Sequence, residues 1–186
     1  MNEQLAQETA LKLLDAADAD LVGTVVEQYA QRLDVLGDHG PLHWERALIN
    51  GLLLSQTNPI VDKELVFYFS LFHDSKRENE NEDPLHGPRG AEYGEELIRM
   101  LPKSTQRKIH IFEQACGNHT AMLYSSEPTV AACFDADRLD LNRVRIYPNK
   151  NLMNMREVLS DSFIFQRSQV AKAPYPIELF SKGYRK

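Results

Sequence analysis

Apolar residues recur along most of the chain at three- and four-residue spacing, the pattern of helices that bury one face. Residues 3–18 and then residues 21–36 follow this spacing, through Ala6, Ala10, Leu13, Leu14, Ala17, Leu21, Val25, Tyr29, Leu33 and Leu36. Convincing alternation of apolar and polar residues is missing, apart from one short piece that we expect to be extended, Val144–Tyr147. The pattern therefore predicts an all-α fold.

Prolines mark the starts of several further helices. Proline fits the first helical turn because its missing N–H would have no partner there. With Ser104 as an additional cap, we predict helices over Pro41–Leu54, Asn58–Phe72, Gly87–Met100 and Ser104–Cys116, and one that begins at Glu127-Pro128. These helices predict a bundle in one domain, residues 1–186, with the N-terminal helices and an extended tail at residues 173–176 packed on it.

Composition limits what the chain is expected to bind. The chain has 186 residues, 42% hydrophobic and 26% charged, and a net charge of -6, which argues against nucleic acid as the main partner. No apolar run approaches the roughly 20 residues of a membrane span, and the N-terminus lacks a signal-peptide pattern. We therefore expect a cytoplasmic protein with no membrane partner, in which Cys116 and Cys133 are reduced and buried.

A His-Asp pair comes after the most apolar stretch of the sequence. Leu65–Phe72 is apolar at nearly every position, and His73-Asp74 comes directly after it. A helix of this kind is buried on most sides, so both polar side chains can reach one cavity. A buried carboxylate is costly unless it is paired, hydrogen-bonded or bound to a cation, so the pair suggests a metal site.

A histidine far upstream is a second candidate ligand. His43 falls in the first turn of the helix predicted from Pro41, next to Trp44. The alternative is a structural histidine packed beside an aromatic ring. Glu45 lies two positions further on and points to another side of the helix, so we expect it to have no catalytic part.

An acidic segment downstream supplies a third candidate. On a helix, Asp137 shares a face with Cys133 and lies near the apolar side, whereas Asp135 should point elsewhere. The alternative is a solvated acidic turn with ion pairs to Arg138 or Arg143.

The order of these residues resembles a known superfamily. His43, then His73-Asp74, then Asp137 within the segment Asp-Ala-Asp-Arg-Leu-Asp are similar to the HD domain superfamily of metal-dependent phosphohydrolases, over about residues 38–150. The resemblance implies an all-α, HD-like bundle in which His43, His73, Asp74 and Asp137 bind a divalent metal.

Two further histidines extend the resemblance. His86 lies just before a predicted helix and His119 just after one. In HD proteins with additional histidines a second metal can bind, which implies His86 and His119 as ligands and Asp74 as the bridge. The alternative is that both are surface loop histidines. His39 and His110 match no motif, and we expect them to be structural.

The ligand types set the expected cofactor and reaction. Histidine and carboxylate together suit Mn, Fe, Co, Ni or Zn, and such sites also admit Mg; one or two ions are expected. A bound metal acidifies water and polarises a phosphoryl oxygen, so we expect a phosphohydrolase that acts on a nucleotide or another small phosphoester. Asp74 and Arg77 are the predicted catalytic residues, and the predicted substrate-binding residues are Lys76, Arg77 and Arg89.

Alternatives remain open from the sequence. The three basic residues can instead form surface pairs with Glu78, Glu80 or Glu82. Some HD proteins, inositol oxygenase among them, hold two irons on four histidines and two aspartates, which the same six residues supply. A domain that binds a nucleotide or a metal for regulation, without catalysis, is the third possibility.

Overall fold

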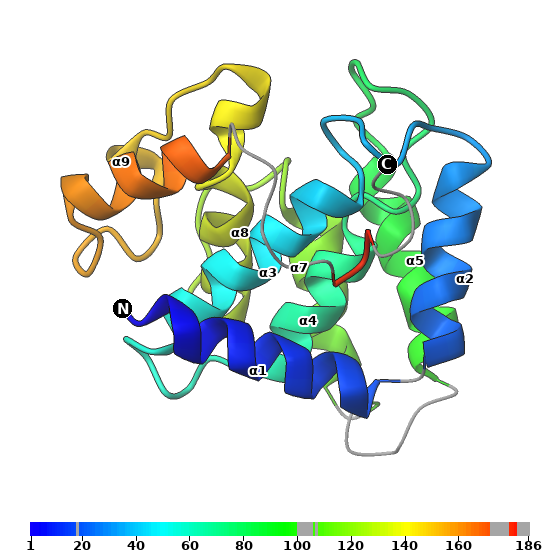
Figure 1. The fold of residues 1–186 in the computed structure, drawn as a ribbon, viewed down its shortest axis with the longest axis horizontal. Helices are drawn as coiled ribbons and strands as arrows, with labels where there is room; N and C mark the ends of the chain where they lie inside the picture. The colour runs from blue at the N-terminus through cyan, green and yellow to red at the C-terminus, as the bar shows by residue number, and fades with distance from the viewer. Residues whose placement is uncertain (18, 100–105, 107, 172–178, 182–186) are drawn as a thin grey trace.

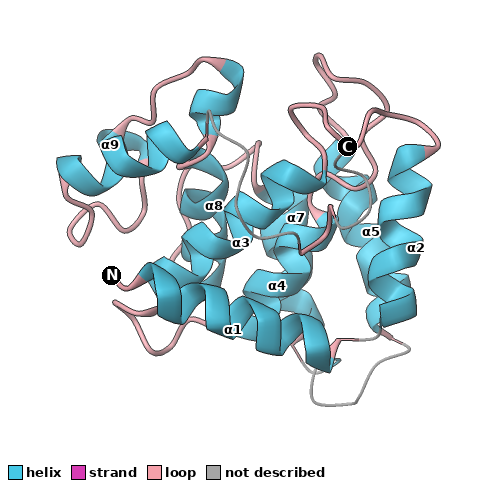
Figure 2. Cartoon of the chain, in the orientation of Figure 1, coloured by secondary structure: helices cyan, strands magenta, loops and turns pink. Residues whose placement is uncertain are grey.

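The chain folds as a bundle of helices. The computed structural model describes residues 1–17, 19–99, 106, 108–171 and 179–181. Helices and loops make up this part, with no strand among the described residues (Figure 1, Figure 2), so the predicted all-α fold is confirmed. None of the described helices has both the length and the apolar character of a membrane span. The elements are α1 (Glu3–Ala16), α2 (Ala19–Ala30), α3 (Pro41–Ser55), α4 (Lys63–Phe72), α5 (His86–Ile98), α7 (Ile109–Asn118), α8 (Pro128–Arg138), the 3-10 helices η1 (Leu141–Val144) and η2 (Lys150–Leu152), and α9 (Asp161–Val170).

Helix α4 lies at the centre of the bundle. It packs against α1, α2, α3, α5, α7 and α8. In the view of Figure 1, α1 runs below α4, α3 runs above it and α7 lies behind it. Every residue of Leu65–Phe72 is buried. Neighbours on all sides explain why this segment is apolar throughout instead of along one stripe. The end of α4 therefore delivers His73 and Asp74 into the interior.

Two of the predicted helix starts are confirmed, and one helix begins later than predicted. Helix α3 begins at Pro41, and α8 begins at Pro128, where the Glu127 side chain accepts a hydrogen bond from the backbone N of Val130 at 2.7 Å. Helix α4 begins later than predicted, because Asp62 is its cap and accepts hydrogen bonds from the backbone N atoms of the first turn. Asn58 instead stabilises the preceding turn.

Two other predicted boundaries are wrong. Helix α2 ends at Ala30 instead of continuing to residue 36, and Arg32 there donates to the carbonyl of Ser75 at 2.6 Å. The segment from Val144 is not an extended piece, since Val144 closes η1 and Arg145 adopts left-handed backbone with φ 66°. The expected cap at Ser104, the helix end at residue 100 and the tail at residues 173–176 lie outside the described residues.

Both cysteines are buried and free, as predicted. Cys116 belongs to α7 and Cys133 to α8. Burial raises the pKa of both thiols well above the usual value. They are therefore protonated at neutral pH and serve as small core residues.

Candidate metal centre

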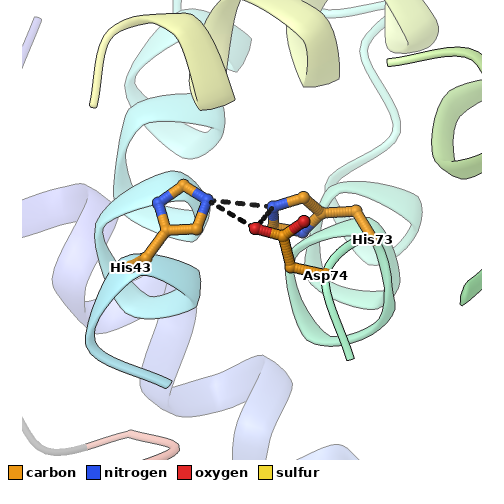
Figure 3. Close-up of side chains that lie close together, drawn as sticks. All are labelled: His43, His73 and Asp74. Carbon is orange, nitrogen blue, oxygen red and sulfur yellow. Dashed lines mark hydrogen bonds and ion pairs between the residues drawn. The ribbon is translucent and has the colours of Figure 1, made fainter. Parts of the chain in front are cut away.

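His43, His73 and Asp74 meet in the interior of the bundle, where α3 passes the end of α4 (Figure 3). The Nε2 atoms of the two histidines lie 3.0 Å apart, and each lies 3.7 Å from Oδ2 of Asp74. Asp137 joins them from α8, with its Oδ1 3.2 Å from Nε2 of His43. We refer to these atoms as the first group.

A second group forms on the other oxygen of the same aspartate. Oδ1 of Asp74 lies 3.1 Å from Nε2 of His86 and 3.9 Å from Nε2 of His119. The two Nε2 atoms are 2.9 Å apart. His86 is the first residue of α5, and His119 caps the end of α7. Asp74 thus turns one carboxylate oxygen to each group.

The six residues that the sequence singled out as ligands therefore lie together, and we call them the cluster. All are buried, so His86 and His119 are not surface loop histidines. His39 and His110 do not belong to the cluster: His39 pairs with Glu80 at 2.7 Å, and His110 is exposed. Their structural roles stay predictions.

Gly87 allows the two helix ends of the second group to approach. A Cβ atom at this position would lie 2.6 Å from the carbonyl oxygen of Cys116 and 3.2 Å from Nδ1 of His119. Real Cβ atoms do not approach backbone oxygen so closely. The glycine is therefore needed for His86 to reach His119.

The hydrogen bonds of the histidines favour one tautomer. Each Nδ1 lies beside an oxygen acceptor, which favours the form with the hydrogen on Nδ1 and a lone pair on Nε2 facing the cluster. The acceptors are Asp140 for His43 at 2.7 Å, the Phe69 carbonyl for His73 at 3.1 Å, the Asp83 carbonyl for His86, and the Cys116 carbonyl for His119 at 2.8 Å.

This arrangement is suited to cations. Lone pairs that face each other at 3.0 and 2.9 Å repel unless a positive ion lies near both. Oδ1 of Asp74 and Oδ1 of Asp137 are buried and have no hydrogen-bond partner, which is costly for a charged group. Two sets of three residues can hold a metal ion, His43 with His73 and Asp74, and Asp74 with His86 and His119. The donor set fits divalent transition metals.

The pKa shifts of four residues of the cluster favour the forms that bind metal. Burial lowers the pKa of His73 to about 3 and also lowers the pKa of His119. Burial alone would raise the pKa of Asp74, but the surrounding imidazoles, His73 first, outweigh it and lower this pKa. For Asp137, burial is likewise outweighed by His43 and Arg143. Neutral imidazoles and ionised carboxylates are the metal-binding forms.

Asp140 supports the first group and was not predicted from the sequence. Its Oδ2 accepts the hydrogen bond from Nδ1 of His43, and its Oδ1 accepts one from Nε of Arg46 at 2.7 Å. The sequence signal was available, because Asp140 comes three positions after Asp137 and so faces the same side. A carboxylate of this kind orients a ligating imidazole and raises its basicity.

Arg77 is the only one of the three predicted substrate-binding residues that the described contacts bring to the cluster. Its Nη1 lies 3.6 Å from Oδ1 of Asp74 and 3.3 Å from Nδ1 of His86. Its Nε and Nη2 donate to the carbonyls of Asn79 and Asn81. Arg77 therefore ties the loop after α4 to the second group, and its part in binding substrate stays a prediction.

Lys76 and Arg89 point elsewhere. Nζ of Lys76 donates to Gln28 at 2.7 Å and lies 3.4 Å from the centre of the Tyr93 ring, so it faces α2 and α5. Nη2 of Arg89 donates to Asp83 at 2.6 Å. Their substrate-binding roles stay predictions, and the described conformation gives each another partner.

Glu45 and Asp135 bind backbone away from the cluster. Oδ1 and Oδ2 of Asp135 accept hydrogen bonds from the backbone N atoms of Asn154 and Met155, so this side chain points away from Asp137 as predicted. Oε1 of Glu45 accepts hydrogen bonds from the backbone N atoms of residues 179–181. Both carboxylates hold a later segment of the chain against a core helix.

Compared with models of known families, with characterised proteins and with solved structures, the chain shows no significant match to any of them. The interpretation of the cluster therefore rests on the geometry and chemistry of its own residues.

Proposed function

We propose that the chain is a metal-dependent phosphohydrolase of the HD type, acting on a nucleotide or another small phosphoester. One observation carries the proposal. Four Nε2 lone pairs and two carboxylates, supplied by α3, α4, α5, α7 and α8, converge in the interior, and Asp74 turns one oxygen to each group. The order of the ligands along the chain, similar to the HD superfamily, supports the same reaction.

The ligands divide naturally between two ions. His43, His73, Asp137 and Oδ2 of Asp74 would hold one, and the second group would hold the other through Oδ1. A divalent metal bound there supplies an acidified water and polarises a phosphoryl oxygen.

Two side chains next to the cluster, Asp140 and Arg77, would position a ligand and supply positive charge. Asp140 accepts from Nδ1 of His43, which orients the ring so that Nε2 faces the cluster. Arg77 places a permanent positive charge 3.6 Å from Asp74, where it offsets carboxylate charge and favours an anionic substrate.

A second candidate is a di-iron oxygenase of the HD type. The observation that favours it is the bridging position of Asp74 together with four histidines and two aspartates, the ligand count of such enzymes. A regulatory domain without catalysis is less well supported, because binding alone has little need for a complete shell with unpaired carboxylate oxygens.

Metal loading followed by activity assays separates the candidates. The purified protein is loaded with Mn, Co, Ni, Zn or Fe, and the metal per chain is measured by elemental analysis. Cleavage of a phosphoester panel with Mn, Co or Ni supports the hydrolase. Two irons with a mixed-valence electron paramagnetic resonance signal and oxygen uptake would replace it with the oxygenase. Metal uptake without either activity would favour the regulatory domain.

A further inference from the structure

Arg143 lies at the side of the cluster that is most open to solvent. Of the six ligand side chains, that of Asp137 is 13% exposed, and the other five are at most 5% exposed. Nη2 of Arg143, on η1, lies 3.5 Å from Oδ1 of Asp137. Asp137 is therefore the most exposed of the six side chains, and Arg143 lies beside it.

The guanidinium of Arg143 is held in place by one hydrogen bond, but one of its buried nitrogens has no hydrogen-bond partner. Nε donates to the carbonyl of Asp38 at 2.8 Å, which holds the plane of the group. Nη1 lies 3.8 Å from Oδ2 of Asp140, is buried, and has no hydrogen-bond partner. The side chain as a whole is only 6% exposed. A buried charged donor without a partner is unfavourable, so the arrangement is suited to a ligand that supplies the acceptor.

The other described arginines near the cluster leave no buried side-chain nitrogen without a hydrogen-bond partner. Arg77 donates to two loop carbonyls and lies against His86. Arg46 donates through Nε to Oδ1 of Asp140, the oxygen that does not bind His43. Among the described residues, the unpartnered buried arginine nitrogen is that of Arg143.

We infer that Arg143 binds the anionic oxygens of the substrate's phosphoryl group at the open side of the cluster. The inference rests on the proposed function, since it assigns a residue to that same site. The planar fork of arginine matches two phosphoryl oxygens at once. Neutralisation of Asp137 by a bound metal would also free Nη2 of Arg143 to turn to the substrate.

Binding of orthophosphate tests the inference without any turnover. Calorimetry measures phosphate affinity for the Mn-loaded wild type, Arg143→Gln, Arg143→Lys and the control Arg145→Gln, after the metal per chain has been measured for each. Arg145 is an exposed arginine two positions away. We expect Arg143→Gln to weaken phosphate binding about 10- to 100-fold at unchanged metal content. Arg143→Lys should give a smaller loss, and the control should match the wild type.

Each other outcome has a clear meaning. Equal phosphate affinity in the wild type and Arg143→Gln, at equal metal content, would overturn the inference and leave the proposed function standing. A wild type that takes up no metal would overturn both. If Arg143→Gln does not fold or loses metal, Arg143→Lys decides, and unchanged phosphate affinity there overturns the inference. Loss of metal in both variants would assign Arg143 to holding Asp137, which also overturns it.

Discussion

The two groups of the cluster are built on unequal parts of the molecule. The first group stands on α3, α4 and α8, where almost every residue is buried, including all of residues 43–55 and 129–137. The second group adds the first residue of α5 and the cap of α7, helices that bury far fewer residues. Half of the buried residues of α5 are glycines, Gly87, Gly90 and Gly94.

This difference bears on how firmly each group is held. Local opening is easiest where few apolar contacts are buried, and glycine adds backbone freedom to the open form. The first group is therefore preformed by the core, whereas the second depends on the contact between two helix ends. We expect the first group to bind metal more tightly. We expect the second group to bind it more weakly, because its two helix ends can separate more easily.

Asp74→Ala should have the largest effect, because it removes the residue that both groups share. We expect metal content to fall well below one ion per chain and any activity to be lost, as elemental analysis and the best phosphoester assay would show. His110→Ala, at an exposed position, is the matched control and should keep both. Full metal content in Asp74→Ala would show that the cluster is not the metal site.

Loss of a histidine from each group tests the comparison directly. His119→Ala should lose one ion and keep the other, because the first group stays intact. His43→Ala should cost more, because it also leaves Asp140 with an unfilled acceptor in the core. Metal titrations of the two variants measure this. Equal losses of metal and of melting temperature would remove the distinction between the groups.

Asp140→Asn should weaken the first group without removing a ligand. The amide keeps the shape but takes away the charge that supports His43 and pairs with Arg46. We expect about a 10- to 100-fold loss of affinity for the first ion, measured by competition with a chelator. The second ion should bind as in the wild type, and a loss confined to the second ion would contradict the assignment.

Thiol labelling should show the smallest difference between the two halves. Both thiols are buried with raised pKa values, so both should react slowly in the native protein. Cys116 lies on α7, next to the second group, and Cys133 lies on the fully buried stretch of α8. We expect Cys116 to be modified first, as mass spectrometry of partly labelled protein would show. Earlier labelling of Cys133 would reverse the ranking of stability.

Local chemistry made much of the fold predictable. Pro41 and Glu127-Pro128 act through backbone geometry and caps within one turn, and these helix starts are confirmed. Asn58 and Asp62 offer similar caps four residues apart, and the sequence pattern did not distinguish them. Helix α2 ends at Ala30, and Arg32 beyond it donates to Ser75, a contact between residues far apart in the sequence that the pattern did not indicate.

The site shows the same division. Residue types singled out His43, His73, Asp74 and Asp137 as candidates, because few side chains bind metals and a helix that is apolar on all sides carries its C-terminal residues into the interior. The resemblance of their order to the HD superfamily implied that they are ligands and added His86 and His119. The sequence could not predict which residues the basic side chains contact. Whether Lys76 turns to Gln28 or to the cluster depends on helices far away in the sequence.

The sequence by itself determined that the chain is helical, that α4 is buried and that His73-Asp74 lies inside, since periodicity and apolar character are enough to predict these features. Only the tertiary structure decided that Asp74 turns one oxygen to each group, that Asp140 supports His43 and that Arg143 lies beside Asp137. The reason is physical: residue type sets which atoms can bind, but the packing of helices distant in sequence sets the distances between them.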